Sequence, residues 1–333
     1  MKIVRSLEEM GETAPSSLAL GAFDGLHRGH MAVIGRACAP GEGGRRLQPA
    51  VFTFSRSPAG NSAVLTGRDK ERLLEDAGVE VLYSLEFSQV KDWEAEAFVE
   101  QVLFETCAAQ RLCCGEDFRF GRGARGDTAL LQTLCDRRGV ELTVVPPVKE
   151  GGEKVSSTRI RAAVEAGDIS LANRLLGRPF GFSLEVIHGN HIGTGLGTPT
   201  SNQAIPEGFV LPRFGVYASW CRVGGEYFYG VTNVGVKPTV GSDRVLAETW
   251  MPEFQGDLYG KRVRVFLLEF LRPEKKFGSL EELKAAIQTN GEQAKEAAAQ
   301  VPPPYFPSRR QGAAPGNLPH NSRKPLYKPQ GVC

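Results

Sequence analysis

The chain has 333 residues, of which 41% are hydrophobic, enough for one large or two ordinary domains with cores of their own. Charged residues make up 23% and the net charge is +2, so the composition gives no reason to expect a specific nucleic-acid partner. No apolar run is long enough to cross a membrane, and residues 1–10 lack the apolar core of a signal peptide. We therefore expect a cytoplasmic protein that binds no membrane, and the oligomeric state stays open.

The first half of the chain alternates predicted strands with predicted helices. Apolar patterns at 97–103 and 130–134 indicate helices, and Asp168 is expected to cap a helix that stops at Gly177. Such alternation predicts a Rossmann-like α/β domain over residues 1–180, with a parallel sheet that binds ligands at the carboxyl ends of its strands. Short apolar runs predict the buried strands, at 18–20, 51–54, 81–83, 112–114 and 142–145.

The residue pattern of the sequence changes after Gly181. Short runs rich in β-branched residues at 184–187, 215–220, 227–232 and 263–270 predict a small all-β barrel over residues 181–300. Ser279, with Glu282 three residues later, predicts the start of a C-terminal helix. Residues 301–333 hold eight prolines, five Lys or Arg and no acid, so we expect a disordered basic tail.

The segment after the first predicted strand is rich in Gly and His, and reads GAFDGLHRGH from residue 21 to residue 30. It places His27 and His30 three residues apart at a predicted helix start, where free N–H groups and the helix dipole favour phosphate. Gly29 between them lets a nucleotide approach the backbone. Attack on the α-phosphorus of ATP needs alignment and charge stabilisation rather than a covalent nucleophile. The motif therefore predicts nucleotidyl transfer.

Two later segments are expected at the same edge of the sheet. The first, GEDFRFG over 115–121, follows the strand that ends at Cys114 and carries Asp117. The second, SSTRIR over 156–161, opens a helix with hydroxyl groups and arginines, which suit phosphate.

The second domain has its own polar segment, GLGTPTSN over 195–202. Glycines such as Gly195 let backbone amides face phosphate. Thr200 and Asn202 are two residues apart on a predicted strand, so they point the same way and can share a cation with its nucleotide.

Together these motifs closely resemble the bacterial bifunctional riboflavin kinase/FAD synthetase family over roughly residues 18–300. The resemblance implies that ATP drives phosphorylation of riboflavin to FMN and adenylylation of FMN to FAD. It implies that the loop carrying Asp117 lines the nucleotide and flavin site. It also implies a set of nucleotide-binding residues, with His27 and His30 as the catalytic pair: Phe23, Asp24, His27, Gly29, His30, Ser157, Thr158 and Arg161.

For the barrel, the resemblance implies that Thr200 contacts Mg²⁺ and that Asn202 helps to hold the metal or the nucleotide, beside Gly195. It places the general base at Glu248, where a carboxylate can take the proton of the ribityl 5′-hydroxyl. The signature FQGDLYG over 254–260 accompanies that glutamate.

This chain departs from the family pattern at several positions. In the α/β domain, Ala22 replaces an Asn, and the residues Arg56-Ser57-Pro58 replace a Pro-His-Pro turn. In the barrel, Thr194, Thr198, Trp250 and Glu253 replace Arg, Phe, His and Asp, and loss of an Arg removes a bidentate phosphate donor.

Three alternatives to the bifunctional enzyme stay open, and the departures at Thr194, Thr198 and Trp250 are the motive for the first. The first is an FMN adenylyltransferase whose barrel binds flavin without phosphorylating it. The second is a non-catalytic flavin-sensing regulator that uses its basic tail as a contact. The third is a nucleotidyltransferase for another acceptor, such as a cytidylyltransferase.

Overall fold

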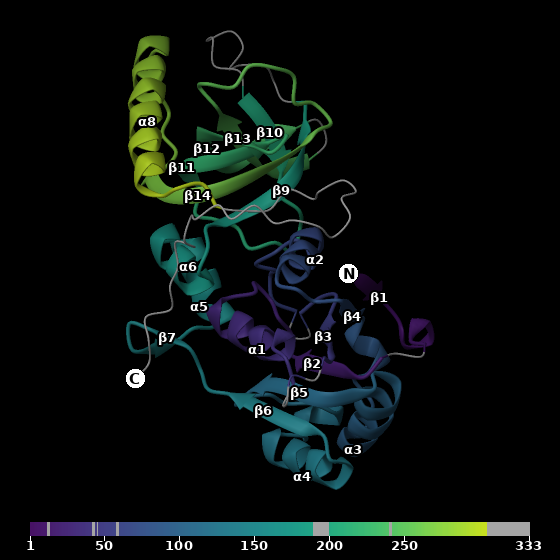
Figure 1. Ribbon diagram of the computed structural model, residues 1–333. Coiled ribbons are helices and arrows are strands. Elements are labelled where there is room, and N and C mark those ends of the chain that lie inside the picture. The colour runs from purple at the N-terminus through teal and green to yellow at the C-terminus, as the bar shows by residue number, and fades with distance from the viewer. Residues whose placement is uncertain are drawn as a thin grey trace.

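The computed structural model describes residues 1–11, 14–41, 44, 46–57, 60–188, 200–239 and 242–304. It consists of an α/β unit and a β-barrel joined through the helices α5 and α6 (Figure 1). The fold class predicted from the sequence, a Rossmann-like domain followed by a small barrel with a C-terminal helix, is confirmed.

The α/β unit is built on a six-stranded parallel sheet with strand order β1-β4-β3-β2-β5-β6. The five predicted strands are present, and β1 pairs with β4 at the edge as a sixth strand that the sequence did not predict. The strands are β1 (Lys2–Val4), β2 (Ser16–Leu20), β3 (Gln48–Phe54), β4 (Val81–Leu85), β5 (Ala109–Gly115) and β6 (Glu141–Val145). The hairpin of β7 (Lys149–Glu150) and β8 (Glu153–Lys154) follows them.

Helices cover both faces of this sheet, so that the strands are buried between two apolar cores. One core joins α1 and α2 to the sheet, and the other joins η4 and α4 to it. The predicted helix near residue 100 is a short α-turn that continues as a π-helix. The helices are α1 (Arg28–Cys38), α2 (Gly67–Asp76), α3 (Ala95–Ala97), η4 (Phe98–Thr106), α4 (Thr128–Arg138), α5 (Ser157–Ala166) and α6 (Ile169–Leu176), with short 3₁₀ turns η1 (Leu7–Glu9), η3 (Phe87–Gln89) and η5 (Arg122–Ala124).

The second unit is a closed antiparallel barrel of order β10-β13-β12-β11-β14-β9. The helix α8 (Leu280–Gln300) lies along its outer wall, where Ala294 and Ala298 pack against Ala218 and Leu268 (Figure 1). The Ser279 side chain caps this helix, as predicted, by accepting from Glu282 N at 3.2 Å. The strands are β9 (Phe180–Ile187), β10 (Thr200–Ala204), β11 (Gly215–Val223), β12 (Glu226–Thr239), β13 (Ser242–Trp250) and β14 (Arg262–Arg272).

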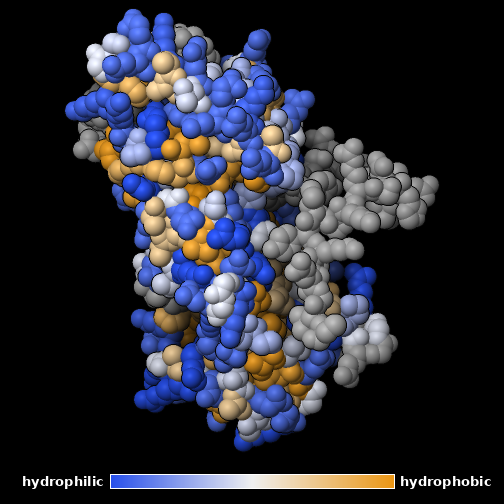
Figure 2. Space-filling view, turned by 90° about the vertical axis from the view of Figure 1, so that its left-hand side faces the viewer, coloured by the Kyte–Doolittle hydropathy of each residue, from blue (hydrophilic) through white to orange (hydrophobic). Residues whose placement is uncertain are grey.

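The two units share one apolar core. Side chains of α5 and α6, such as Ile160 and Leu175, belong to the same buried cluster as Phe180 and Leu267 of the barrel. The predicted cap and stop of α6 are present: Asp168 accepts from Leu171 N, and Gly177 adopts a left-handed φ of 72°. In Figure 2, hydrophobic residues of one face of the molecule lie at mid-height, where the barrel meets the α/β unit, and also further down over the α/β unit. No helix of the described residues is long and apolar enough to cross a membrane.

The segment expected to be a disordered tail begins with residues that touch the barrel. Trp220 Nε1 donates to Val301 O at 2.7 Å, and the Tyr227 hydroxyl donates to Pro304 O at 2.5 Å. The rest of the predicted tail, 305–333, lies outside the described residues. The described part of the predicted tail, residues 301–304, is therefore in contact with the barrel.

This difference predicts unequal effects for two truncations. A chain cut after Gln300 loses both acceptors and should lose about 1–2 kcal/mol of unfolding free energy, because each such bond contributes roughly 0.5–1.5 kcal/mol. A chain cut after Pro304 keeps both bonds and should unfold like the full chain. Denaturant unfolding of both truncations checks this, and equal stability of the two would contradict the anchoring role.

Candidate active sites

The predicted histidine motif lies in the turn between β2 and α1. His27 is the N-cap of α1, and its Nδ1 accepts from His30 N at 3.2 Å. Because Nδ1 is an acceptor, the neutral ring carries its proton on Nε2, which is free to donate to a ligand. The two imidazole rings are stacked with centroids 3.5 Å apart, and the Phe23 ring meets His30 edge-on at 5.3 Å.

The backbone of this turn is strained, and hydrogen bonds to its carbonyl groups hold it in place. Phe23 and Leu26 have φ values of +47° and +44°, which are unfavourable for bulky L residues, and Gly25 between them has φ +83°. Side chains from distant parts of the chain hold four of its carbonyl groups. The donors are Thr53 and Lys70 to Ala22 O, Ser157 to Asp24 O, and Arg178 to Gly25 O and Leu26 O.

Burial keeps both histidines neutral. Desolvation, with the charge of Arg178 next in size, lowers the pKa of His27 from 6.5 to about 4. Burial also lowers the pKa of His30 well below 6.5, with smaller contributions from His27 and Lys70. The pKa of Lys70 itself falls to about 8 through burial.

The histidine pair opens onto a cavity of about 820 Å³, a volume within the range of small-molecule sites. Polar groups meet there at the carboxyl ends of β2 and β5 and at the start of α5, as expected for a sheet of this type. Lys154 and Asp117 form an ion pair at 2.6 Å in this wall, and the hydrogen bond from Lys154 lowers the pKa of Asp117. The lining also includes an aromatic surface, called here the phenylalanine wall, formed by Phe52, Phe54, Phe87, Phe98, Phe118 and Phe120.

The structure brings most of the predicted residues of this site to the cavity. Its lining includes Phe23, His27, Gly29, His30, Asp117 and Ser157. Asp24 and Arg161 form instead a half-buried ion pair at 2.6 Å, and the second carboxylate oxygen of Asp24 accepts from Val64 N. Thr158 is exposed and outside the cavity lining. The nucleotide contacts predicted for these three residues stay predictions.

Sequence reasoning missed three cations around the site. Lys154, two residues before the predicted Ser-rich segment, lines the cavity. Lys70 and Arg178 reach the turn from α2 and from the segment after α6. Only Lys154 carried a local signal, its closeness to Ser156 and Ser157, since the other two are placed by tertiary contacts.

The second predicted site forms on the outer face of the barrel. The Asn202 backbone pairs with Glu248 across β10 and β13, and Glu248 pairs with Asn233 across β13 and β12. Ala247 and Thr249 are fully buried, so alternation along β13 puts Glu248 on the opposite, outer face, where it is half-buried. Thr200, two residues before Asn202, shares this face with it.

Two amide groups in this site have unused hydrogen-bonding capacity. Asn202 is 5% exposed, and its Oδ1 has no hydrogen-bond partner among the described residues. Asn233 Nδ2 donates to Glu274 Oε1 at 3.2 Å, while its Oδ1 is likewise unpartnered there. A buried amide oxygen without a donor is costly, which indicates that a ligand completes the site. The predicted residue Gly195, together with Thr194 and Thr198, lies outside the described residues.

Comparison with known proteins decides the family. A family model described as FAD synthetase matches residues 10–159, and one described as riboflavin kinase matches residues 176–298. The chain is 33% identical over 302 residues to the bifunctional riboflavin kinase/FMN adenylyltransferase of Escherichia coli (strain K12), covering 86% of this chain and 95% of that protein. The chain belongs to the bifunctional riboflavin kinase/FMN adenylyltransferase family. This confirms the predicted family and the predicted class of enzyme, a transferase.

Other members of the bifunctional riboflavin kinase/FMN adenylyltransferase family align over similar lengths. The protein of the same name from Pseudomonas fluorescens is 35% identical over 303 residues, covering 87% of this chain and 96% of its own. That from Bacillus subtilis (strain 168) is 34% identical over 299 residues, covering 85% and 92%. A crystal structure of a macrolide-efflux protein from Streptococcus pneumoniae has a TM-score of 0.79 and 29% identity over 88% of this chain and 98% of that one, so the two share their fold.

The lowered pKa of His27 predicts an acid-sensitive fold. Between pH 6.5 and about 4, His27 binds a proton in the unfolded chain but not in the folded protein. The free energy of unfolding therefore decreases as the pH falls through this interval. The loss amounts to roughly 3 kcal/mol over that interval. His27→Gln should therefore lose about 2–3 kcal/mol less stability than wild type between about pH 7 and about pH 4.5.

Denaturant unfolding at the two pH values measures this difference. His188→Gln, which replaces an exposed histidine in the other unit, is measured beside it as the control for the substitution itself. If His27→Gln loses as much unfolding free energy between the two pH values as wild type and His188→Gln do, then His27 titrates normally in the folded protein.

Proposed function

We propose that this chain converts riboflavin to FMN in the barrel and FMN to FAD in the α/β unit, using ATP in both reactions. We assign the adenylyltransferase to residues 1–180 and the kinase to residues 181–300. The observation that carries the proposal is the cavity of about 820 Å³, whose lining combines the His27–His30 pair with the phenylalanine wall. A cytoplasmic location and free flavins and ATP as its partners belong to the same proposal.

The α/β cavity suits adenylyl transfer to a flavin. An oxygen of the FMN phosphate attacks the α-phosphorus of ATP, and the bond to the pyrophosphate breaks. His27 donates from Nε2 toward the phosphates near the N-terminal end of the α1 dipole, and Ser157 and Gly29 line the same cavity. Neutral imidazoles can gain protons as negative charge enters, so they add charge stabilisation where the pyrophosphate leaves.

The phenylalanine wall supports a flavin as the acceptor. Phe52 and Phe98 meet edge-to-face with ring centroids 5.5 Å apart, and Phe118 stacks on Phe120 at 5.6 Å. A planar isoalloxazine ring gains both apolar burial and favourable ring contacts on such a surface. A small hydrophilic acceptor, as in the cytidylyltransferase alternative, would leave this surface uncovered.

The barrel face suits phosphoryl transfer to a hydroxyl group. Glu248 takes the proton of the ribityl 5′-hydroxyl while that oxygen attacks the γ-phosphorus and ADP leaves. Thr200 and Asn202 would hold Mg²⁺, and the buried Oδ1 of Asn202, which no described residue contacts by a hydrogen bond, is the hard oxygen ligand that this ion prefers. When bound, the ion supplies neutralisation of phosphate charge.

One observation favours the narrower alternative, an adenylyltransferase with an inactive kinase. Trp250 stands at the end of β13 opposite Thr200, and its ring packs against α8, so that a Cβ on Gly291 would lie 3.1 Å from it. This bulky ring replaces the family's His beside the proposed metal ligand.

Label transfer from ATP separates the bifunctional enzyme from the narrower alternative. With riboflavin and γ-labelled ATP, the bifunctional enzyme forms labelled FMN, whereas α-labelled ATP puts label into FAD and none into FMN. The adenylyltransferase alone takes no label from γ-labelled ATP into FMN, yet forms α-labelled FAD when FMN is supplied. The non-catalytic regulator gives no labelled flavin in any arm.

Replacing both His27 and His30 by Ala should abolish FAD formation and spare FMN formation. Loss of preorganised donors at a charged transition state costs about 10²–10³-fold in rate for each donor. Because the two sites lie in different units, riboflavin phosphorylation should stay within about twofold of wild type. His188→Ala, at an exposed histidine, is the matched control. Equal loss of both activities in a folded double variant would contradict the two-site assignment.

Glu248→Gln should lower riboflavin phosphorylation by about 10²–10⁴-fold, the usual contribution of a positioned base. The variant keeps the shape of the side chain, so flavin binding and FAD synthesis from supplied FMN should not change. Thr200→Ala should instead raise the Mg²⁺ concentration needed for half-maximal rate, because it removes a ligand. If Glu248→Gln phosphorylates riboflavin as fast as wild type, the base lies elsewhere.

A further inference from the structure

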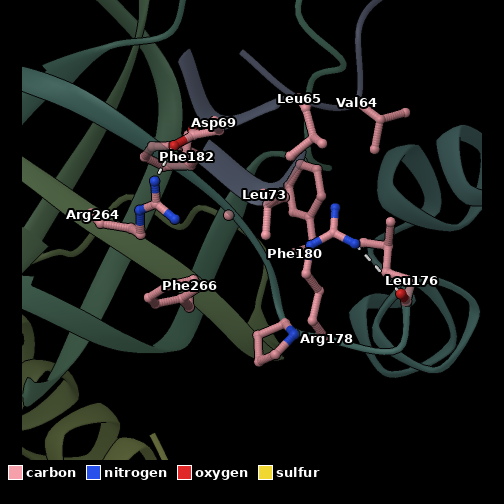
Figure 3. A pocket seen from close by; sticks show the side chains of 12 residues that line it. Val64, Leu65, Asp69, Leu73, Leu176, Arg178, Phe180, Phe182, Arg264 and Phe266 are labelled. Carbon is pink, nitrogen blue, oxygen red and sulfur yellow. Dashed lines mark hydrogen bonds and ion pairs between the residues drawn. The ribbon is translucent and has the colours of Figure 1, made fainter. Parts of the chain in front are cut away.

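Arg178 crosses from the segment between the two units to the histidine turn. It lies between the end of α6 at Leu176 and the start of β9 at Phe180. Its guanidinium group donates to Gly25 O at 2.5 Å and to Leu26 O at 2.7 Å, with a longer contact to Leu176 O at 3.4 Å. Figure 3 shows this side chain beside Phe180, in the wall of a small cavity at the junction.

The two carbonyl groups that it holds belong to the strained part of the turn. Gly25 and Leu26 have φ values of +83° and +44°, and the residue after them, His27, caps α1. A bulky residue keeps a positive φ only where surrounding contacts enforce it. The other tied carbonyls of the turn, Ala22 O and Asp24 O, are held from within the α/β unit. Arg178 is therefore the contact that reaches the turn from the segment leading into the barrel.

We propose that Arg178 is a positioning residue for adenylyl transfer, which fixes the Gly25–Leu26 backbone so that His27 meets the triphosphate of ATP. The inference rests on the adenylyltransferase activity proposed above and adds to it a residue outside the cavity lining. It also makes that activity depend on the junction, because the segment that carries Arg178 continues directly into β9.

The charges around the histidines give Arg178 a second effect. His27 faces Arg178, Lys154 and Asp117, and His30 faces Lys70 as well as the same two cations. Cations outnumber the one carboxylate, which favours neutral imidazoles before ATP binds and a phosphate-rich ligand afterwards. Removal of the Arg178 charge should therefore raise the pKa of His27.

Arg264 provides a matched comparison on the other side of the same junction. It lines the same cavity of about 20 Å³, room for about one water molecule, and forms a buried ion pair with Asp69 of α2 (Figure 3). Asp69 Oδ2 also accepts from Ser183 N of β9 at 3.2 Å. Arg264 holds the units together without contacting the histidine turn, so it reports the effect of loosening the junction alone.

The test uses the full chain with Arg178→Lys, Arg178→Met and Arg264→Lys. Measurements are kcat and KM for FMN adenylylation over pH 3.5–8, the Kd of MgATP at each of the two sites, the rate of riboflavin phosphorylation, and thermal stability. Arg178→Met should lower kcat for adenylylation by about 30-fold or more, since small misplacements of a reacting group can cost about 10²-fold. It should also weaken MgATP binding and shift the acidic limb of the pH profile upward, with phosphorylation unchanged.

The conservative variants separate positioning from stability. Arg178→Lys keeps the charge and one donor, so it should restore the position of the acidic limb and part of kcat. Arg264→Lys should lower thermal stability without shifting the acidic limb of the pH profile for adenylylation. The proposal is overturned if Arg178→Lys and Arg178→Met, both folded, bind MgATP and make FAD like wild type. It is also overturned if Arg264→Lys reproduces the pH shift. If wild type binds MgATP but makes no FAD, the proposed function is overturned instead. The Kd of MgATP in the Arg178 variants, compared with wild type, would then still test whether Arg178 positions the site.

Discussion

The turn between β2 and α1 runs against the backbone preferences of its own residues, and the adenylyltransferase site depends on the contacts that hold it there. Positive φ values at Phe23 and Leu26 persist because Lys70, Ser157 and Arg178 bind the carbonyl groups around them. Each donor comes from a different segment, so the turn takes its shape only when the whole unit and its junction are folded. The neutral, stacked histidines are a consequence of that burial.

In the barrel, the register of the strands brings the site residues together. Residues 202, 233 and 248 are distant in sequence, and antiparallel pairing puts them in one row on the outer face. Their neighbours point inward, where the hydroxyl groups of Ser219, Thr232 and Thr249 form a buried chain with links of 2.8 and 2.9 Å. One set of strands thus supplies a buried hydroxyl chain inside the barrel and, among the described residues, unpartnered amide oxygens of Asn202 and Asn233 on its outer face, where ligand atoms are needed.

The sequence predicted the features that depend on local patterns. The cap and stop of α6 at Asp168 and Gly177, the helix start at His27 and the Ser279 cap were all found, because each signal lies within a few residues of its effect. The strand β1 was not predicted, since it is three residues long and gains its place by pairing with β4.

The candidate site shows the same division between local and long-range signals. The histidine and serine motifs were visible in the sequence, while the ion pair of Asp24 with Arg161 and the placement of Lys70 and Arg178 were not. These contacts join residues 48 to 153 positions apart, and no local pattern encodes such a pairing.

The central claim is that one chain carries two separate active sites linked by FMN, and a mixing experiment tests it most directly. Protein with His27 and His30 both replaced by Ala is combined with Glu248→Gln protein, riboflavin and MgATP, and the flavins are separated by chromatography. The account predicts FAD in the mixture and little from either protein alone, because FMN made in the barrel of one reaches the cavity of the other. A mixture that forms no FAD, while each protein retains its own remaining half-reaction, would contradict it.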